Sequence, residues 1–482
     1  MSFRNFIIVA SVFVGLGAAT ASAAAQIGTS NIRLYSEVSP QRLGSRTAND
    51  IWGYVSPSGR EYAIIGARRT MAVIEVTDPV NPVIVHVEPH LPSGSGDFKV
   101  YQHYAYGLGD KFNLHILDLS AVDDGVVTLA GEEHIFGHNL FINEESGYMY
   151  VFNLFDNPRP GTRIYDLSDP VNPEFVAYIN PSDAQAHDAQ VVNYHDGPYA
   201  GREIMYLHIA DLGLDIIDVT DKQNVTLLAN ITYPGIGFCH QGWLDEDRNY
   251  YYVDDAFDEM MGRSPMTRTL VFDVRDPANP FLASSFTTGL RASDHNLFWH
   301  EGFVYEANWA SGLWIFDARI DPLNPDIVGW YDTYPLDDED GIFHGAMAPY
   351  PFFPSGNIIL SDWQRGLLVF DATEARGERF GLDVGPLIRG EACQITAIDA
   401  KPGETIYFLY SGFGQEGWTW IDEVGGYASL QNAVVADTAV TDSNGSASVS
   451  PIVPPRAQAG RPVWLQAIQV GKSSLVVEAI VE

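Results

Sequence analysis

The chain of 482 residues is strongly acidic, with 62 Asp and Glu against 27 Lys and Arg and a formal net charge of −35. This surplus of acid repels phosphate backbones and anionic headgroups, which argues against nucleic acid and an anionic membrane surface as partners. Hydrophobic residues make up 46% of the chain and charged residues 18%, which is enough apolar material for a large core. The presence of only two cysteines excludes a disulfide framework.

The amino-terminal residues have the pattern of a secretory signal peptide. Arg4 supplies a positive charge, an apolar run extends from Phe6 to Leu16, and Ala21-Ser22-Ala23 fits a cleavage site. The apolar run is short for a membrane span, although a retained anchor helix is the alternative. We predict a signal peptide over residues 1–25 and an exported protein, secreted or periplasmic, with no membrane span after signal removal. A place at the cell surface is a further alternative, but the sequence contains no anchor motif.

One short pattern, three or four apolar or β-branched residues that end in an acid, organises the chain. Its seven copies are MAVIE (71–75), LHILD (114–118), TRIYD (162–166), LDIID (214–218), TLVFD (269–273), LWIFD (313–317) and LLVFD (367–371), with successive acids 43 to 55 residues apart. Five copies run into a turn of the type TDPVNP (77–82), where Asp-Pro and Asn-Pro favour a turn. We expect each terminal acid to accept hydrogen bonds from backbone N–H groups of this turn.

Each repeat contains four strand-like runs, two of them before the acid-ending strand, such as HNLFIN (138–143) and GYMYVFN (147–153). Units of four short strands with this spacing are typical of propeller blades. The predicted fold class is therefore all-β, with a seven-bladed β-propeller over residues 46–379. The last repeat lacks a fourth strand, and the segment 26–45 contains the unassigned run NIRLYSEVS (31–39). We predict that this run is the outer strand of the last blade, where it removes an exposed sheet edge.

Residues 380–482 do not continue the repeat. Runs such as ETIYFLYS (404–411) and VWLQAIQV (463–470), with PG and NG turns elsewhere in this region, are typical of short antiparallel strands. This pattern predicts a small carboxy-terminal β-sandwich module.

The acid-ending strands and their proline turns resemble those of LVIVD-repeat proteins. The stretches that resemble the choice-of-anchor B group within that family are HQGWLDEDRNYYYVDDAFDE (240–259), DHNLFWHEGFVYEANWASGLWIFD (294–317) and YPFFPSG (350–356). The resemblance covers about residues 46 to 375. It implies an exported bacterial β-propeller outside the cytoplasm, and it implies no particular biochemical activity.

Histidine recurs at one position of the repeat, the start of the first strand of each predicted blade. The seven starts carry Asp50, His103, His138, His187, His240, His295 and His344. Because first strands are innermost in a propeller, these side chains are predicted to form a ring around the axis. Imidazole and carboxylate groups bind zinc, copper or iron, so a subset of the ring is a candidate metal site. The alternative is structural: each histidine bonds the backbone or a carboxylate of a neighbouring blade.

A second candidate site is the acidic cluster Asp254, Asp255, Asp258 and Glu259 in the run DDAFDE. Carboxylate oxygens are the ligands that calcium prefers, so this cluster predicts a calcium site. A solvated acidic surface is the alternative.

Two functions are compatible with these features. The first is a non-catalytic binding or scaffold module that presents its surface to an extracytoplasmic protein or glycan, and we expect such a module to be a monomer. The alternative is a metal-dependent enzyme, a hydrolase or an oxidoreductase, with its site at the propeller axis. The sequence contains neither an H-E-x-x-H nor a G-x-S-x-G motif, which favours the binding module.

Overall fold

The computed structural model describes residues 29–482, apart from 90–95, 110–111, 136, 154–159, 337–342, 378, 415–418, 422, 425 and 470–471. The predicted signal peptide, residues 1–25, lies outside the described residues. The helices of the described part are three short 3₁₀ turns, η1 (Pro40–Leu43), η2 (Val122–Asp124) and η3 (Gly197–Tyr199). Within these residues no helix has the length and hydropathy that crossing a membrane requires.

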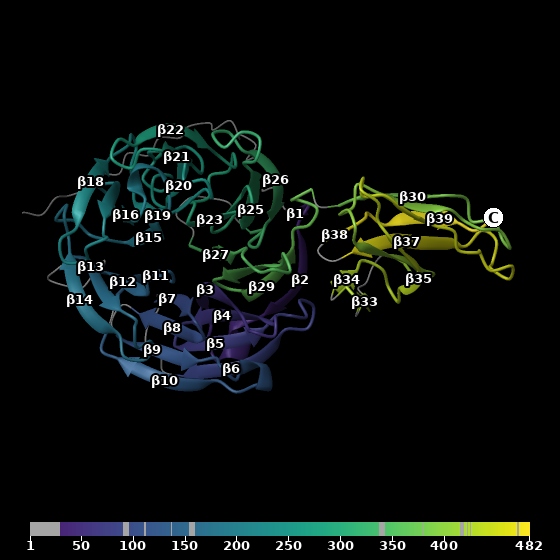
Figure 1. The fold of residues 1–482 in the computed structure, drawn as a ribbon, viewed down its shortest axis with the longest axis horizontal. Coiled ribbons are helices and arrows are strands. Elements are labelled where there is room, and N and C mark those ends of the chain that lie inside the picture. The colour runs from purple at the N-terminus through teal and green to yellow at the C-terminus, as the bar shows by residue number, and fades with distance from the viewer. Residues whose placement is uncertain are drawn as a thin grey trace, which may run out of the picture.

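Seven antiparallel sheets stand around a common axis in chain order and form a β-propeller (Figure 1). Blade 1 consists of β3 (Ala48–Val55), β4 (Glu61–Ala67), β5 (Thr70–Glu75) and β6 (Val83–Pro89), and blade 2 of β7 (Gly96–Tyr101), β8 (Tyr104–Gly109), β9 (Phe112–Asp118) and β10 (Thr128–Glu133). Blade 3 consists of β11 (Asn139–Asn143), β12 (Tyr148–Asn153), β13 (Gly161–Asp166) and β14 (Glu174–Ile179). Blade 4 consists of β15 (Asp188–Asn193), β16 (Glu203–His208), β17 (Leu214–Asp218) and β18 (Thr226–Ile231). Blade 5 consists of β19 (Cys239–Leu244), β20 (Tyr250–Asp255), β21 (Thr269–Asp273) and β22 (Phe281–Phe286). Blade 6 contains β23 (Asn296–His300), β24 (Phe303–Ala307), β25 (Leu313–Asp317) and β26 (Asp326–Tyr331). Blade 7 contains β27 (Ala346–Tyr350), β28 (Ile358–Asp362) and β29 (Gly366–Asp371).

The amino-terminal segment completes the last two blades. β2 (Arg33–Val38) pairs antiparallel with β29, from Arg33 opposite Asp371 to Val38 opposite Leu367, and is the outer strand of blade 7. β1 (Thr29–Ser30) pairs with β26 and adds a fifth strand to blade 6, a contact that the repeat pattern did not predict. The edge of β29 is thereby covered, and strands from the two ends of the repeat region meet in one sheet.

The core lies between the blades. Seven clusters of buried apolar side chains each join two adjacent blades, and the last of them joins blade 7 to blade 1. Second strands such as β4 and β16 are buried at every residue because both faces of each sheet are covered by neighbouring blades. The first strands of neighbouring blades also contact one another all the way around the axis. Their leading side chains therefore converge on the hub.

The recurrent acid shapes the turn after the third strand, as expected, in six of the seven blades. Oδ1 of each aspartate accepts the backbone N–H of the residue two positions further on, at 2.6 to 3.2 Å, in Asp118, Asp166, Asp218, Asp273, Asp317 and Asp371. Glu75 of blade 1 differs, because its Oε1 accepts a hydrogen bond from Arg60 Nε at 2.8 Å. These acids are thus explained by local structure and need no functional role.

The carboxy-terminal residues form three small antiparallel sheets. The first consists of β30 (Gly381–Val384), β31 (Ile395–Ile398) and β36 (Ala447–Val449). The second consists of β32 (Thr405–Ser411), β35 (Val434–Val440), β37 (Pro462–Gln469), β38 (Lys472–Ser473) and β39 (Val477–Ile480). The third pairs β33 (Thr419–Ile421) with β34 (Gly426–Ala428). One buried cluster contains side chains of both larger sheets. Arg33 of the propeller donates to Ser429 Oγ at 2.8 Å across the boundary between the two regions.

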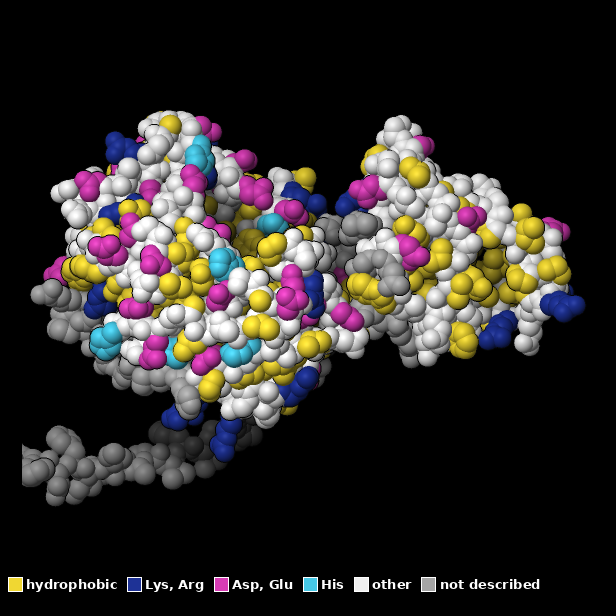
Figure 2. All heavy atoms as spheres, turned by 60° about the horizontal axis from the view of Figure 1, so that its bottom comes forward, with side chains coloured by type: hydrophobic (Ala, Val, Ile, Leu, Met, Phe, Trp, Pro, Cys, Tyr) yellow, Lys and Arg dark blue, Asp and Glu magenta, His cyan; other side chains and the backbone are white. Residues whose placement is uncertain are grey.

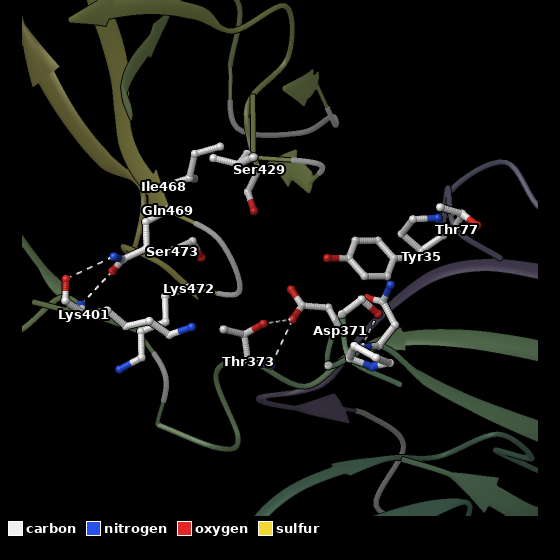
Figure 3. A pocket seen from close by; sticks show the side chains of 16 residues that line it. Tyr35, Thr77, Asp371, Thr373, Lys401, Ser429, Ile468, Gln469, Lys472 and Ser473 are labelled. Carbon is white, nitrogen blue, oxygen red and sulfur yellow. Dashed lines mark hydrogen bonds between the residues drawn. The ribbon is translucent and has the colours of Figure 1, made fainter. Parts of the chain in front are cut away.

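A pocket of about 230 Å³ lies at this boundary, with Tyr35 and Asp371 on the propeller side and Lys401 and Lys472 on the other (Figure 3). Elsewhere, acidic side chains are spread over the visible propeller face, and basic ones are fewer (Figure 2). This distribution agrees with the strongly negative net charge.

Candidate functional site

The first strands of four blades place a histidine at the same end of the propeller axis. His138, His187 and His295 directly precede β11, β15 and β23, and His240 is the second residue of β19. In chain order, the centroids of neighbouring imidazole rings lie 4.9, 4.3 and 4.3 Å apart. We call these four side chains the histidine arc.

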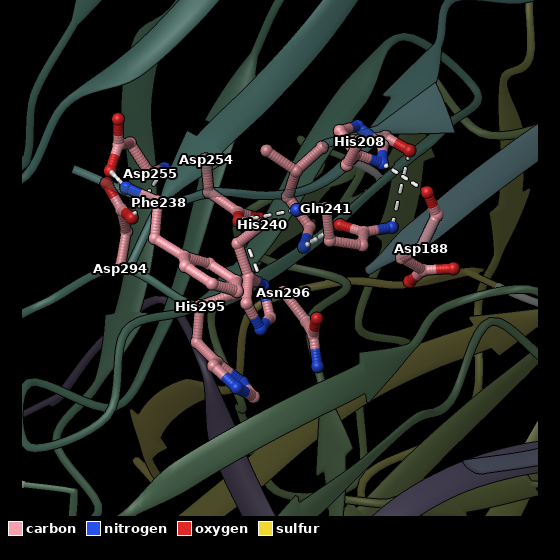
Figure 4. Close-up of polar contacts among 12 residues, drawn as sticks. Asp188, His208, Phe238, His240, Gln241, Asp254, Asp255, Asp294, His295 and Asn296 are labelled. Carbon is pink, nitrogen blue, oxygen red and sulfur yellow. Dashed lines mark hydrogen bonds and ion pairs between the residues drawn. The ribbon is translucent and has the colours of Figure 1, made fainter. Parts of the chain in front are cut away.

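Three imidazoles of the arc are held by the backbone of the next blade. In each case Nδ1 lies 2.7 Å from a backbone carbonyl oxygen. His187 contacts the carbonyl of His240, His240 contacts that of His295, and His295 contacts that of Met347. A carbonyl oxygen can only accept, so Nδ1 carries the proton in all three rings. Nδ1 of His240 also lies 3.2 Å from Oδ1 of Asp254 (Figure 4). These bonds connect blades 4 to 7, and Nε2 is left as the unprotonated nitrogen.

Burial keeps these three rings neutral. It is the main cause that lowers the pKa of His187 and of His240 well below the usual value, and neighbouring histidines lower both further. Burial lowers the pKa of His295 to about 4. At pH 7 each ring therefore has a lone pair on Nε2. Within the described residues these three Nε2 atoms have no hydrogen-bond partner.

A cavity of about 290 Å³ lies against the histidine arc. Aromatic rings form another part of its wall. The ring centroid of Trp309 lies 4.4 Å from that of His295 and 5.4 Å from that of Phe343. The ring centroids of Trp363 and Trp309 are 6.4 Å apart. Both tryptophans come from turns between second and third strands and were not predicted, although a Trp-x-x-Gly pattern recurs at these two turns. The cavity thus combines hydrogen-bond acceptors with aromatic faces.

The histidine arc does not have the donor spacing of a single-metal site. Among the described residues, the only group of three or more His, Cys, Asp or Glu donors within 4.8 Å of one another consists of Asp258, Glu259 and Asp294. A transition metal needs its ligands within about 2.0–2.3 Å of the ion. The rings of the arc would have to turn toward one point to bind one ion together.

His103 and His344 lie outside the arc. His103 is in the turn between β7 and β8, where its side chain is 39% exposed and its Nε2 is 3.9 Å from Asp118 Oδ1. The predicted alignment took HYAYG as a first strand, but it forms the second strand of blade 2, and the first strand has no histidine. His344 is exposed, two residues before β27, with its ring 5.1 Å from that of Tyr334. The structure therefore groups four of the six predicted histidines.

Asp50 belongs to a second layer of axial side chains, next to the arc and centred on Lys99. The Lys99 ammonium binds Asp97 Oδ1 at 2.5 Å, and it lies 4.6 Å from the ring centroid of Trp52. Burial and then the charge of Asp97 raise the pKa of Asp50 well above its usual value and that of Asp188 to about 8. The Asp188 carboxyl is thus largely protonated at pH 7, and Lys99 pairs with Asp97.

Aromatic side chains fill the axis on the other side of this layer. The rings of Trp243 and Phe298 lie 4.9 Å apart, and Phe352 lies 5.9 Å from Trp243. The void that Lys99 shares with Trp243 and Phe298 measures only about 20 Å³. The histidine cavity is therefore a pocket at one end of the propeller and does not continue as an open channel.

A group of buried carboxylates, Asp258, Glu259 and Asp294, lies near the arc. Their oxygen atoms are within 4.8 Å of one another, and each residue is at most 1% exposed. The calcium prediction named Asp258 and Glu259 but missed Asp294. The other two predicted residues bind elsewhere: Asp254 contacts His240, and Asp255 accepts hydrogen bonds from Tyr233, Gly237 and Phe238.

The sequence position of Asp294 distinguishes it from the equivalent residues of other blades. It directly precedes a leading histidine, where blades 3, 4 and 5 have the uncharged residues Gly137, Ala186 and Cys239. Burial and the charges of Asp258, Asp254 and Asp255 raise the pKa of Asp294 well above its usual value. Figure 4 shows Asp294 beside Asp255. Because other blades fold with an uncharged residue at this position, the blade structure does not require an acid there.

No family model and no curated protein matches the chain. Among solved structures, it is similar to the β-propeller domain of Cps50 (Swd1) from Myceliophteria_thermophila, with a TM-score of 0.48 and 11% sequence identity. The match covers 70% of this chain and 98% of that chain. The similarity is one of fold alone.

Proposed function

We propose that the chain is an exported, non-catalytic binding module whose recognition site is the cavity at the histidine arc. The observation that carries this proposal is the set of three neutral imidazoles that line the cavity and have Nε2 atoms without a partner in the described residues. A concave site with a few convergent polar groups among aromatic side chains is typical of small-ligand recognition.

The chemistry of the cavity suits a small ligand rich in hydroxyl groups, such as the end of a glycan. Its volume of about 290 Å³ is close to the lower end of the range for ligand sites, roughly 300–1,000 Å³. Imidazole lone pairs accept hydrogen bonds from hydroxyl groups, and the rings of Trp309 and Trp363 can pack against the C–H face of a sugar. The net charge of −35 disfavours an anionic ligand.

A metal-dependent hydrolase or oxidoreductase is the second candidate. One observation favours it: histidines that bind a metal usually donate their other ring N–H to a carbonyl or carboxylate, as His187, His240 and His295 do. Zinc, copper or iron would then be bound by Nε2 of a subset of the arc after the rings turn toward one another.

Titration with neutral monosaccharides and disaccharides, followed by calorimetry and saturation-transfer NMR, tests the proposal. We expect one of these sugars to bind the wild-type protein and to bind Trp309→Ala about tenfold more weakly, because a lost aromatic contact costs roughly 1–1.5 kcal/mol. His195→Ala is the control, since that imidazole is 62% exposed, pairs with Glu145 and does not line the cavity.

Two results would contradict the binding module. One is the absence of sugar binding to the wild-type protein. The other is stoichiometric zinc, copper or iron in protein purified from its native compartment, with the metal lost in His240→Ala, which would support the enzyme.

We also infer a place outside the cytoplasm, secreted or periplasmic, and a relationship to LVIVD-repeat proteins of the choice-of-anchor B group. The signal-peptide pattern supports the first inference, and the seven acid-ending strands with their proline turns support the second. The shared core of the carboxy-terminal sheets supports a small β-sandwich module. The expected partner is an extracytoplasmic glycan or protein, bound by a monomer.

A further inference from the structure

We propose that Asp258, Glu259 and Asp294 bind one calcium ion, at a site separate from the histidine cavity. The proposal does not depend on the function proposed above. Asp258 and Glu259 lie in the segment between β20 and β21, and Asp294 lies between β22 and β23. The three carboxylates thus come from two segments of the chain and converge to within 4.8 Å.

Three of the six carboxylate oxygens in this group receive no hydrogen bond from the rest of the described chain. Both Oε atoms of Glu259 and Oδ1 of Asp258 are buried and have no hydrogen-bond partner in the described part of the chain. Glu259 is 1% exposed, so bulk water does not replace the missing partners. An unpaired buried carboxylate has a large desolvation cost, and a bound cation removes that cost.

Neighbouring groups hold the carboxylates of Asp258 and Asp294 in place. Nε of Arg268 donates to Oδ2 of Asp258 at 2.9 Å, which leaves Oδ1 available to a ligand. The backbone N–H groups of Asp255 and Arg268 donate to the two oxygens of Asp294 at 3.0 and 3.1 Å. Each carboxylate oxygen has a further lone pair, so Asp294 can still bind a cation.

The charge and the donor type both point to calcium. Three carboxylates and the single guanidinium of Arg268 leave a formal charge of −2. The group contains only carboxylate oxygens, which suit a cation with about six to eight oxygen ligands, and it lacks the nitrogen and sulfur donors typical of zinc sites. The competing state is a proton on Glu259 that is shared with Asp258, because burial, the charges of Asp294 and Asp258, and a hydrogen bond to Asp258 raise the pKa of Glu259 to about 12. Calcium binding has to displace this proton.

A calcium ion here would hold the segment after β20 against the strand that follows His295. The same segment reaches the histidine cavity, since the ring of Phe257 lies 6.0 Å from that of Phe343. Loss of the ion should therefore loosen this side of the molecule.

Calcium titration of the full-length mature protein after dialysis against EGTA tests the site. We expect one Ca²⁺ per chain in equilibrium dialysis and a rise in Tm of about 5 °C at a thousandfold excess over Kd. Glu259→Gln should lose both the bound ion and the rise in Tm. In EGTA its Tm should equal or exceed that of the wild type, because the amide removes a buried acid without partners.

Glu203→Gln is the matched control. Glu203 is also buried, but its oxygens accept hydrogen bonds from Tyr150, Ser146, Asn143 and Lys222, so the variant should still bind one calcium ion. Asp211→Asn, at an exposed turn, serves the same purpose without disturbing the core. Three results would overturn the proposal: no stoichiometric calcium in the wild type, unchanged calcium binding by Glu259→Gln, or tighter binding of Mg²⁺ or Zn²⁺ than of Ca²⁺.

Discussion

Replacement of Lys99 by methionine is expected to lower the free energy of unfolding by about 3–5 kcal/mol, because Asp97 would remain buried without its ion-pair partner. The side chains of Lys99 and Asp97 are only 12% and 2% exposed, so solvent does not screen the pair. Methionine fills a similar volume, so the loss reports the charge and not a cavity. Urea denaturation followed by tryptophan fluorescence measures the effect.

The double variant Lys99→Met/Asp97→Asn separates the ion pair from other effects. Asparagine is uncharged, so the double variant should recover at least about half of the stability that Lys99→Met loses. Recovery will be incomplete because Asp97 Oδ2 also accepts the N–H of Leu140 from the next blade, at 2.9 Å. A loss below about 1 kcal/mol in the single variant would mean that this layer of the axis is hydrated.

His208→Asn is expected to destabilise the protein less at pH 4.5 than at pH 7.5, by about 2.5 kcal/mol. His208 is completely buried, and burial lowers its pKa to about 3. Its Nδ1 donates to the carbonyl oxygen of Asp188 at 3.1 Å, and its Nε2 lies 3.2 Å from the Tyr251 hydroxyl oxygen. The folded state thus favours the neutral ring.

The direction of this effect follows from the two pKa values. The histidine pKa is about 6.5 in the unfolded chain, so the stability that neutral His208 contributes is complete above pH 6.5 and is lost as pH falls toward 3. Urea denaturation of both proteins at the two pH values measures the difference. Other buried groups, such as Glu306 with a pKa raised by burial to about 7, are present in both proteins and cancel. An equal destabilisation at both pH values would show that His208 titrates normally in the folded state.

The propeller was predictable because its signals are local and repeated. The acid at the end of each third strand bonds the turn that follows it, so the same letters recur wherever a blade makes that turn. The strand in residues 31–39 was predictable because the last repeat has only three strand-like runs and therefore needs a fourth strand from elsewhere in the chain. β1 is only two residues long and has no such signal, so its pairing with β26 could not be foreseen.

The candidate sites were predictable only in part because they depend on contacts between blades. His138, His187, His240 and His295 share a position in the repeat, and that position alone placed them together. The first strand of blade 2, GDFKVY, has no histidine, so HYAYG with His103 was mistaken for it. Glu259 and Asp294 are 35 residues apart, and only the folded chain brings their carboxylates to one point.

Three neutral imidazoles with Nε2 atoms free of partners in the described residues carry the proposed function of the propeller axis. Long-range ¹H–¹⁵N correlation NMR of protein labelled at its 13 histidines, with signals assigned through single His→Asn variants, observes the protonation state of each ring nitrogen directly. At pH 7 we expect His187, His240 and His295 to carry a proton on Nδ1 and none on Nε2. A proton on Nε2 or a charged imidazolium at these positions at pH 7 would contradict the account.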